Sequence, residues 1–269
     1  MKQIFDHIVS SLQPVYSLSE ARELAFWVIE ETTGLTRTDV LCGKDTQNIS
    51  NIEIILQRLC KKEPIEYIFG HCLWSGLDLL VNSATLIPRP ETAELVTLIT
   101  RQVTTPHLRV LDIGTGSGCI ALALQQAQPT WQVTGVDVSE KALQVAQQNA
   151  VRNQLPVIFE HKDILTDEID NFDIIVSNPP YVTASEKNAM DSNVLDFEPH
   201  TALFVPDDNP LLFYRRIAEL RKATHLFFEI NERFGAAMIQ LLRACHYTDI
   251  HLYQDQYGKD RFVYGRIEA

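Results

Sequence analysis

Residues 109–118 read RVLDIGTGSG, an apolar run that leads into three glycines at alternate positions. Glycine tolerates positive φ and lets the backbone come close to a ligand, as in the turn after the first strand of nucleotide-binding sheets. Apolar residues at helical spacing continue through residues 119–128, so the stretch predicts a strand, a glycine turn and a helix in succession. No Gly-Lys-Ser or Gly-Lys-Thr triplet occurs in the chain, which excludes a P-loop.

Strand and helix patterns alternate from this turn to the end of the chain. Such alternation is typical of a largely parallel sheet with helices on both faces. The predicted fold class is therefore α/β, a doubly wound, mostly parallel sheet whose last two strands pair antiparallel. The expected strands are residues 109–113, 132–138, 157–159, 172–177, 225–230, 250–253 and 262–266. The expected helices are residues 119–128, 139–152 with Ser139 as cap, 211–222 and 235–244.

The residues before the sheet predict a small helical domain over residues 1–75. Ser17 and Glu20 have the spacing of a capping box, and Gly34 marks the expected end of that helix. Ser50 and Glu53 repeat the box before a second apolar stripe. Alternation and turn-forming residues then predict a hairpin linker over residues 76–90, which leaves residues 91–269 as the larger domain.

Charge and cysteine content limit the classes of partner and compartment. The chain carries 23 Lys plus Arg against 35 Asp plus Glu, a net charge of −12. Proteins that bind nucleic acid or anionic membranes need a cationic surface, so neither is expected as a direct partner. Five cysteines without a CxxC pair argue against disulfides and a zinc ribbon and favour the cytoplasm.

Four further expectations concern absent features. The scattered histidines have no metal-ligand spacing, so no metal is expected. No apolar run reaches the ~18 residues of a membrane span, and the N-terminal stretch is too polar for a signal peptide. No heptad pattern suggests more than a monomer.

The glycine turn and the acids near it predict a nucleotide cofactor. Asp137 ends the next expected strand, where an acid accepts hydrogen bonds from ribose hydroxyls. A D-x-G-x-G-x-G turn with a downstream acid is similar to the S-adenosylmethionine site of class I methyltransferases. By analogy, Asp163 and Ile164 would hold the adenine, and Asp112 would hold the loop. The alternative is a purely structural turn. The candidate cofactor residues are Asp112, Gly114, Thr115, Gly116, Ser117, Gly118, Asp137, Asp163, Ile164 and Asn178.

A second motif predicts the reaction. The expected strand at residues 172–177 runs into Asn178-Pro179-Pro180-Tyr181. The prolines have no N–H, so their carbonyls and the Asn178 amide oxygen can accept both hydrogens of one NH₂ group, while Tyr181 offers a ring for stacking. This arrangement suits methyl transfer to a weakly nucleophilic planar nitrogen. The alternative is an ordinary turn. We assign catalysis to Asn178, Pro179 and Tyr181, and substrate binding to Asn178, Pro179, Pro180 and Tyr181.

With these motifs in place, the chain resembles the bacterial release factor glutamine N5-methyltransferase family from end to end. The shared features are residues 64–70 (PIEYIFG), 87–92 (IPRPET), 114–118, 178–181, 198–203 (EPHTAL) and 213–217 (FYRRI). The chain departs from the pattern at Ala93, where an acid is expected, and at Asn231, where a glycine is expected.

The resemblance implies a function and its partners. It implies that the chain uses S-adenosylmethionine to methylate the Gln of the Gly-Gly-Gln tip of class I peptide chain release factors. It implies that the N-terminal domain helps to grip the release factor. Carried over by position, residues 114–118, Asp137, Ile164 and Asn178 would contact the cofactor, and residues 178–181 the substrate glutamine.

Other functions and one long connection stay open. The alternatives are a ribosomal-protein glutamine methyltransferase, a nucleic-acid amino-methyltransferase, which the acidic charge disfavours, and a non-catalytic cofactor-binding protein. Residues 182–210 show little periodicity, and a long connection beside a site is usually functional, so we expect them to form a wall that receives the release factor. The alternative there is a disordered insertion.

Overall fold

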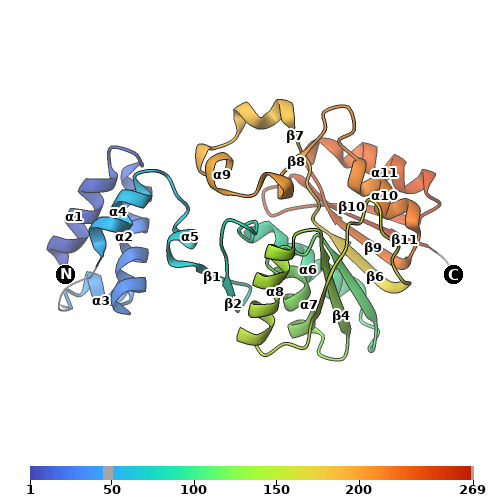
Figure 1. Cartoon of the computed structure of the whole chain (residues 1–269), viewed down its shortest axis with the longest axis horizontal. Helices are drawn as coiled ribbons and strands as arrows, with labels where there is room; N and C mark the ends of the chain where they lie inside the picture. Colours follow the sequence, from blue (N-terminus) through green and yellow to red (C-terminus); the bar gives the residue numbers. More distant parts are fainter. Residues whose placement is uncertain (45–50, 268–269) are drawn as a thin grey trace. The chain divides into compact units, whose positions relative to one another are not determined.

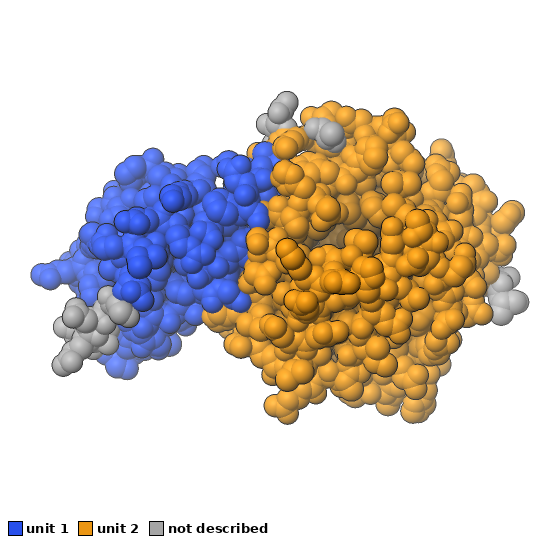
Figure 2. Space-filling model, viewed as in Figure 1, with its two compact units in different colours: residues 1–70, 191–197 blue, residues 71–190, 198–269 orange. Residues whose placement is uncertain are grey.

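The computed structural model describes residues 1–44 and 51–267. The chain divides into two compact units, coloured separately in Figure 2. Unit 1 comprises Met1–Gly70 and Asp191–Phe197, and unit 2 comprises His71–Met190 and Glu198–Ala269. No helix of the described residues is both long and apolar enough to cross a membrane.

Unit 1 is built from helices around one apolar core. The capping box is confirmed, because the Ser17 hydroxyl accepts from Glu20 N and the Glu20 carboxylate accepts from Ser17 N. Gly34 ends that helix at φ 71°, as expected. Ser50 of the second expected capping box lies outside the described residues, and the helix that follows it, α4 (Ile52–Leu59), begins after Asn51. The helices are α1 (Lys2–Leu12), α2 (Leu18–Thr33), α3 (Arg37–Leu41), α4 (Ile52–Leu59) and α5 (Ile65–Phe69), and α1, α2 and α4 supply most of the core.

The hairpin lies earlier in the chain than the prediction of residues 76–90. It pairs β1 (His71–Trp74) with β2 (Leu77–Leu80) in antiparallel register. Ser75 and Gly76 connect the strands with φ of 51° and 80°, the positive values that a two-residue hairpin turn requires. The prediction was wrong because it took Asn82-Ser83 as the turn and overlooked Ser75-Gly76.

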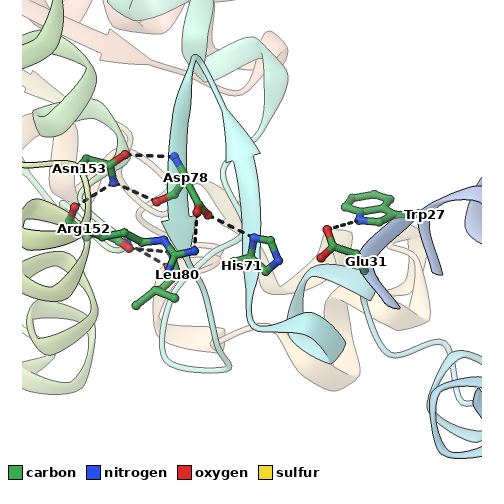
Figure 3. A network of polar contacts seen from close by, with 8 residues as sticks. Trp27, Glu31, His71, Asp78, Leu80, Arg152 and Asn153 are labelled. Carbon is green, nitrogen blue, oxygen red and sulfur yellow. Dashed lines mark hydrogen bonds and ion pairs between the residues drawn. The ribbon is translucent and has the colours of Figure 1, made fainter. Parts of the chain in front are cut away.

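Polar contacts from helix α8 (Glu140–Arg152) hold this hairpin (Figure 3). The Asn149 amide exchanges hydrogen bonds with the backbone N and O of Leu80, at 2.6 and 3.0 Å. Asn153 does the same for the backbone of Asp78, whose carboxylate also pairs with Arg152. Figure 3 shows the contacts of Asp78 with Asn153 and Arg152, together with a separate one inside α2, where the Trp27 indole donates to Glu31.

A seven-stranded sheet forms the centre of unit 2 (Figure 1). Its order is β10-β11-β9-β6-β3-β4-β5. Strands β9, β6, β3, β4 and β5 pair parallel with one another in that order, and β11 pairs antiparallel with both β9 and β10. The doubly wound fold and the antiparallel final pair are therefore confirmed. The strands are β3 (Arg109–Ile113), β4 (Gln132–Asp137), β5 (Ile158–His161), β6 (Phe172–Ser177), β9 (Ala223–Glu229), β10 (Thr248–Gln254) and β11 (Asp260–Arg266).

Helices cover both faces of the sheet. Leu111 and Ile113 of β3 share an apolar cluster with α10 (Leu212–Leu220) and α11 (Gly235–Ala244). Val110 and Asp112 face the other side, where Asp112 meets α7 (Cys119–Ala127). Helix α6 (Pro90–Gln102) was not predicted, although Pro90 stands at its first turn and Leu95, Val96 and Ile99 are buried on one side. The helices are α6 (Pro90–Gln102), α7 (Cys119–Ala127), α8, α10 (Leu212–Leu220) and α11 (Gly235–Ala244).

The connection over residues 182–210 consists of short elements. Two short strands, β7 (Val182–Thr183) and β8 (Phe204–Val205), pair parallel. Between them lie two 3-10 helices, Ala184–Ala189 and His200–Ala202, and helix α9 (Ser192–Phe197). Glu198 anchors the connection, because its carboxylate accepts from Arg89 at 2.5 Å and from Ile87 N at 3.3 Å. The segment is therefore folded, and its role as a substrate wall stays a prediction.

Candidate active site

A pocket opens at the carboxyl ends of β3, β4 and β6 in unit 2. Strand order reverses between β3 and β6, and open α/β sheets bind ligands at such a switch point. The space inside it is about 1090 Å³ when its open, solvent-filled mouth is included. Ten predicted site residues line it: Gly114, Thr115, Gly116, Ser117, Asp137, Asp163, Ile164, Asn178, Pro179 and Pro180. Asp112, Gly118 and Tyr181 are not among the lining residues.

The glycine turn leaves space for a ligand. Gly114 and Gly116 have φ of 72° and 55°, and a Cβ built on either would meet no atom within 4 Å. Gly118 differs, because its Cβ would lie 3.0 Å from the Phe159 ring and 3.2 Å from Ala146. We therefore assign Gly118 to packing between the turn and its surroundings. The two open glycines form the cradle into which a ligand can come close.

Asp112 lies beneath the turn, fully buried. Its Oδ2 accepts from Thr115 Oγ1 at 2.6 Å and from Ala121 N at 3.2 Å, so the carboxylate ties the turn to α7. Its Oδ1 and the Ser117 hydroxyl are buried without a hydrogen-bond partner among the described residues. Burial raises the pKa of Asp112 to about 7, against the lowering effect of its two donors. The turn-holding contacts expected of this acid are present.

Asp137 lies at the pocket end of β4. One carboxylate oxygen accepts from Gly116 N at 2.9 Å and the other from Ser139 N at 2.8 Å. Burial raises the pKa of Asp137, and the backbone donors oppose the shift. Because the residue also lines the pocket, its remaining lone pairs are available to ligand hydroxyls.

Gly135 is a position that the sequence analysis missed. A Cβ there would lie 2.7 Å from Phe159 ring carbons and 2.7 Å from Thr115 Oγ1. We expect Gly135→Ala to lower the free energy of unfolding by about 1–3 kcal/mol through overpacking, measured by urea unfolding. Gln132→Ala, at the exposed start of the same strand, is the control and should change it by less than about 0.5 kcal/mol. Equal midpoints for Gly135→Ala and the parent would contradict the close packing.

Asp163 and Ile164 follow β5 and line the pocket. Asp163 Oδ1 accepts from Leu165 N at 2.9 Å, so this side chain also closes its own turn. The Ile164 side chain is buried, and its carbonyl accepts from Arg216 Nε at 3.0 Å. Arg216 thus fixes one wall of the pocket.

The residues after β6 bring two of the three predicted catalytic residues, Asn178 and Pro179, to the pocket. The Ser177 hydroxyl donates to Ile113 O at 2.7 Å, which ties the ends of β6 and β3 together. Asn178, Pro179 and Pro180 line the pocket directly after this tie. Tyr181 packs against the main core cluster, and its hydroxyl donates to Glu229 Oε1 at 3.5 Å. The predicted stacking role of Tyr181 stays a prediction.

Three further polar residues, Asn149, Thr92 and Glu229, support the site. Asn149 donates to Ser117 O at 2.9 Å while it also holds the hairpin. Thr92 lies in the pocket wall between Asn178 and Glu229, with Oγ1 2.8 Å from Glu229 Oε2 and 3.4 Å from Asn178 Nδ2. Only Thr92 carried a sequence signal, as part of the IPRPET stretch. Asn231, where a glycine was expected, has φ −67° and caps a short turn through Arg233 N, so glycine is not required there.

These features suit a ligand that carries hydroxyl groups and a further polar group. The two open glycines admit the ligand backbone, and Asp137 presents acceptors to hydroxyls. The unpartnered Ser117 hydroxyl and Asp112 Oδ1 are buried polar atoms of the kind that a bound polar group or water satisfies. Across residues 1–44 and 51–267, no three His, Cys, Asp or Glu side chains cluster as metal ligands would.

Comparisons with known proteins point to one family. A family model described as Methyltransferase small domain matches residues 92–196. The release factor glutamine methyltransferase of Bacteroides thetaiotaomicron is 43% identical over 98% of this chain and 99% of its own length. Those of Flavobacterium psychrophilum and Streptococcus pneumoniae are 40% and 37% identical, each over 98% of this chain and over 98% and 97% of their own lengths.

Solved structures agree with the sheet topology. The hMettl16 catalytic domain has a TM-score of 0.58 at 16% identity, with 72% of this chain and 77% of that chain covered. A methyltransferase from Pyrococcus furiosus has a TM-score of 0.52 at 16% identity, with 71% and 89% covered. At this level of identity the likeness concerns the fold alone.

Proposed function

The chain belongs to the release factor glutamine methyltransferase family, and we propose from this that it methylates the side-chain amide nitrogen of the Gln in the Gly-Gly-Gln motif of class I peptide chain release factors. The methyl donor in this proposal is S-adenosylmethionine. The observation that supports it most is that the glycine cradle and Asn178-Pro179-Pro180 line one pocket at the sheet's switch point. A cytoplasmic location follows from this substrate, because translation takes place there.

Each group in the pocket has a role in this proposal. Bound S-adenosylmethionine supplies an electrophilic methyl group. Asn178 Oδ1 and a proline carbonyl accept the two hydrogens of the substrate amide, which holds its nitrogen in line and stabilises the positive charge that develops on it. Both prolines lack an N–H, so this edge of the pocket presents acceptors rather than competing donors. The proton leaves the nitrogen after methyl transfer, so no strong base is needed.

The cofactor part of the proposal rests on Asp137. We expect Asp137→Ala to raise the Kd for S-adenosylmethionine about 10- to 100-fold, since a charge-assisted hydrogen bond contributes about 1.5–3 kcal/mol. Titration calorimetry measures this directly. The control is Asp208→Ala, an exposed aspartate of unit 2 outside the pocket lining. An unchanged Kd for Asp137→Ala would refute the ribose assignment.

The substrate is tested with labelled S-adenosylmethionine and three acceptors offered separately. These are a class I release factor, total ribosomal protein and DNA. We expect label on the release factor alone, and none when the tip Gln is replaced by Ala. Label on a ribosomal protein or on DNA instead would overturn the proposed substrate, and cofactor binding without transfer to any acceptor would favour a non-catalytic protein.

A further inference from the structure

A buried carboxylate lies behind Asn178 and takes no part in the chemistry proposed above. Glu229 ends β9, is 2% exposed and does not line the pocket. Taking a carboxylate out of water is costly unless donors compensate it. The described donors to its side chain are two hydroxyls, Thr92 Oγ1 at 2.8 Å and the Tyr181 hydroxyl at 3.5 Å. A carboxyl group buried with so few donors suggests a role beyond stability.

The hydrogen bonds around Thr92 run in one direction. Its hydroxyl has a single hydrogen, which it donates to Glu229, so only lone pairs remain toward Asn178. Asn178 Nδ2 lies 3.4 Å away and donates to them. With the amide turned by half a rotation, Asn178 Oδ1 would face the Thr92 oxygen with no hydrogen between them. The chain therefore selects the amide orientation that leaves Oδ1 free.

We propose that Thr92 and Glu229 are positioning residues that hold the Asn178 amide with its oxygen toward the substrate nitrogen. This inference rests on the proposed function and deepens it. The amide of an unsupported asparagine can present its NH₂ group as readily as its oxygen. An NH₂ group would repel the hydrogens of the substrate amide. We call the chain of hydrogen bonds from Asn178 through Thr92 to Glu229 the relay. The relay thus decides whether the pocket offers an acceptor to the substrate amide.

The ionised form of Glu229 is the one that keeps this direction. A protonated Glu229 can donate to Thr92, which frees the hydroxyl hydrogen of Thr92 to turn toward Asn178. The amide then loses its preferred orientation. Burial raises the pKa of Glu229 to about 7, so this change falls within an accessible pH range.

Charged and titratable groups from several elements face Glu229. Arg261 of β11 lowers the pKa of Glu229, and Glu91 of α6 raises it. Arg261 itself is bonded to Asp255 at 3.1 Å, so its charge is shared. The Tyr214 hydroxyl of α10 donates to Glu229 O at 3.0 Å, not to the carboxylate. The carboxylate therefore depends mainly on Thr92 and Tyr181 for its donors.

The first test compares two substitutions at Thr92 in the full-length protein. Thr92→Val keeps the shape and removes the hydroxyl, and we expect kcat for release factor methylation to fall about 10- to 100-fold, with KM and the cofactor Kd nearly unchanged. Thr92→Ser keeps the hydroxyl and should restore most of the lost kcat. A Thr92→Val enzyme with the parent's kcat, or one that changes KM alone, would overturn the positioning role.

The second test follows kcat against pH. In the parent, kcat should fall as pH is lowered through about 7, where Glu229 takes up a proton. Asp112 also has a raised pKa of about 7, so the comparison is made in an Asp112→Asn background, where only Glu229 of this pair can titrate. Adding Glu229→Gln to that background should give a lower kcat that is flat from about pH 6 to about pH 8. A step in kcat near pH 7 that is the same with and without Glu229→Gln would overturn the assignment to this carboxylate. Cofactor calorimetry and circular dichroism on each variant separate loss of folding from loss of orientation.

Failure of this inference is distinguishable from failure of the proposed function. If the parent protein does not methylate the release factor, the proposed function is wrong. If the parent methylates it and Thr92→Val does so equally well, only the relay is wrong. The parent's activity is therefore measured first.

Discussion

Asn178→Ala should lower kcat about 10²- to 10³-fold, equivalent to about 2.7–4 kcal/mol of transition-state stabilisation. The substitution removes an acceptor that engages the substrate amide most strongly as charge develops on its nitrogen. Because the acceptor acts mainly in the transition state, the cofactor Kd should change only a few-fold. Single-turnover methylation of a release factor, followed by mass spectrometry of the tip peptide, measures the effect.

The matched control for this experiment lies at the other end of β6. Asn171 is exposed directly before β6, at the end opposite the pocket, and Asn171→Ala should leave kcat near the parent value. If Asn178→Ala turned over within about threefold of the parent, the acceptor role would be refuted, because a lost preorganised hydrogen bond costs far more. A large rise in cofactor Kd with unchanged kcat would instead move Asn178 to cofactor binding.

The second large effect concerns the pH dependence of stability. Burial raises the pKa of Asp112 from 3.8 to about 7, so the folded state holds its proton more tightly than the unfolded state. The stabilisation from this proton is complete below about pH 4 and is lost as pH rises through about 7. The loss approaches about 1.4 kcal/mol per pH unit, or about 4 kcal/mol in all.

Asp112→Asn isolates this contribution, because asparagine does not titrate. Glu229 contributes a slope of the same sign in both proteins, so the difference between them belongs to Asp112. Relative to the parent, the free energy of unfolding of Asp112→Asn should rise steadily from about pH 5 to about pH 7 and then level off. Urea unfolding at each pH measures it. A constant difference across that range would mean that Asp112 keeps an ordinary pKa.

The strands of the sheet were predictable because their signals are local. Residues 109–113 and 172–177 are continuous apolar runs between breakers, and the structure begins and ends β3 and β6 at these same residues. The pocket followed from them, since parallel strands place the turns after them at one edge. The hairpin was misplaced although Ser75-Gly76 is itself a turn-forming pair, because Asn82-Ser83 a few residues later was taken as the turn.

The support behind the pocket was not predictable, because it depends on contacts between distant parts of the chain. Thr92 and Glu229 lie 137 positions apart in sequence, and Asn178 reaches Thr92 across 86. No sequence motif with a fixed spacing links Thr92 to Glu229 or to Asn178. Tyr181 shows the same limit: the motif suggested a ring for the substrate, whereas the fold directs its hydroxyl to Glu229.

The division of the chain into units has a practical consequence for truncation. Unit 1 is discontinuous: the chain leaves it after Gly70, re-enters it at Asp191 and leaves it again after Phe197. Deleting residues 1–70 would therefore remove most of unit 1 but leave its residues 191–197, including α9, attached to unit 2. These residues would lack the rest of their unit while joined to Glu198, whose carboxylate pairs with Arg89. A minimal catalytic fragment needs a second cut that replaces residues 191–197 with a short linker.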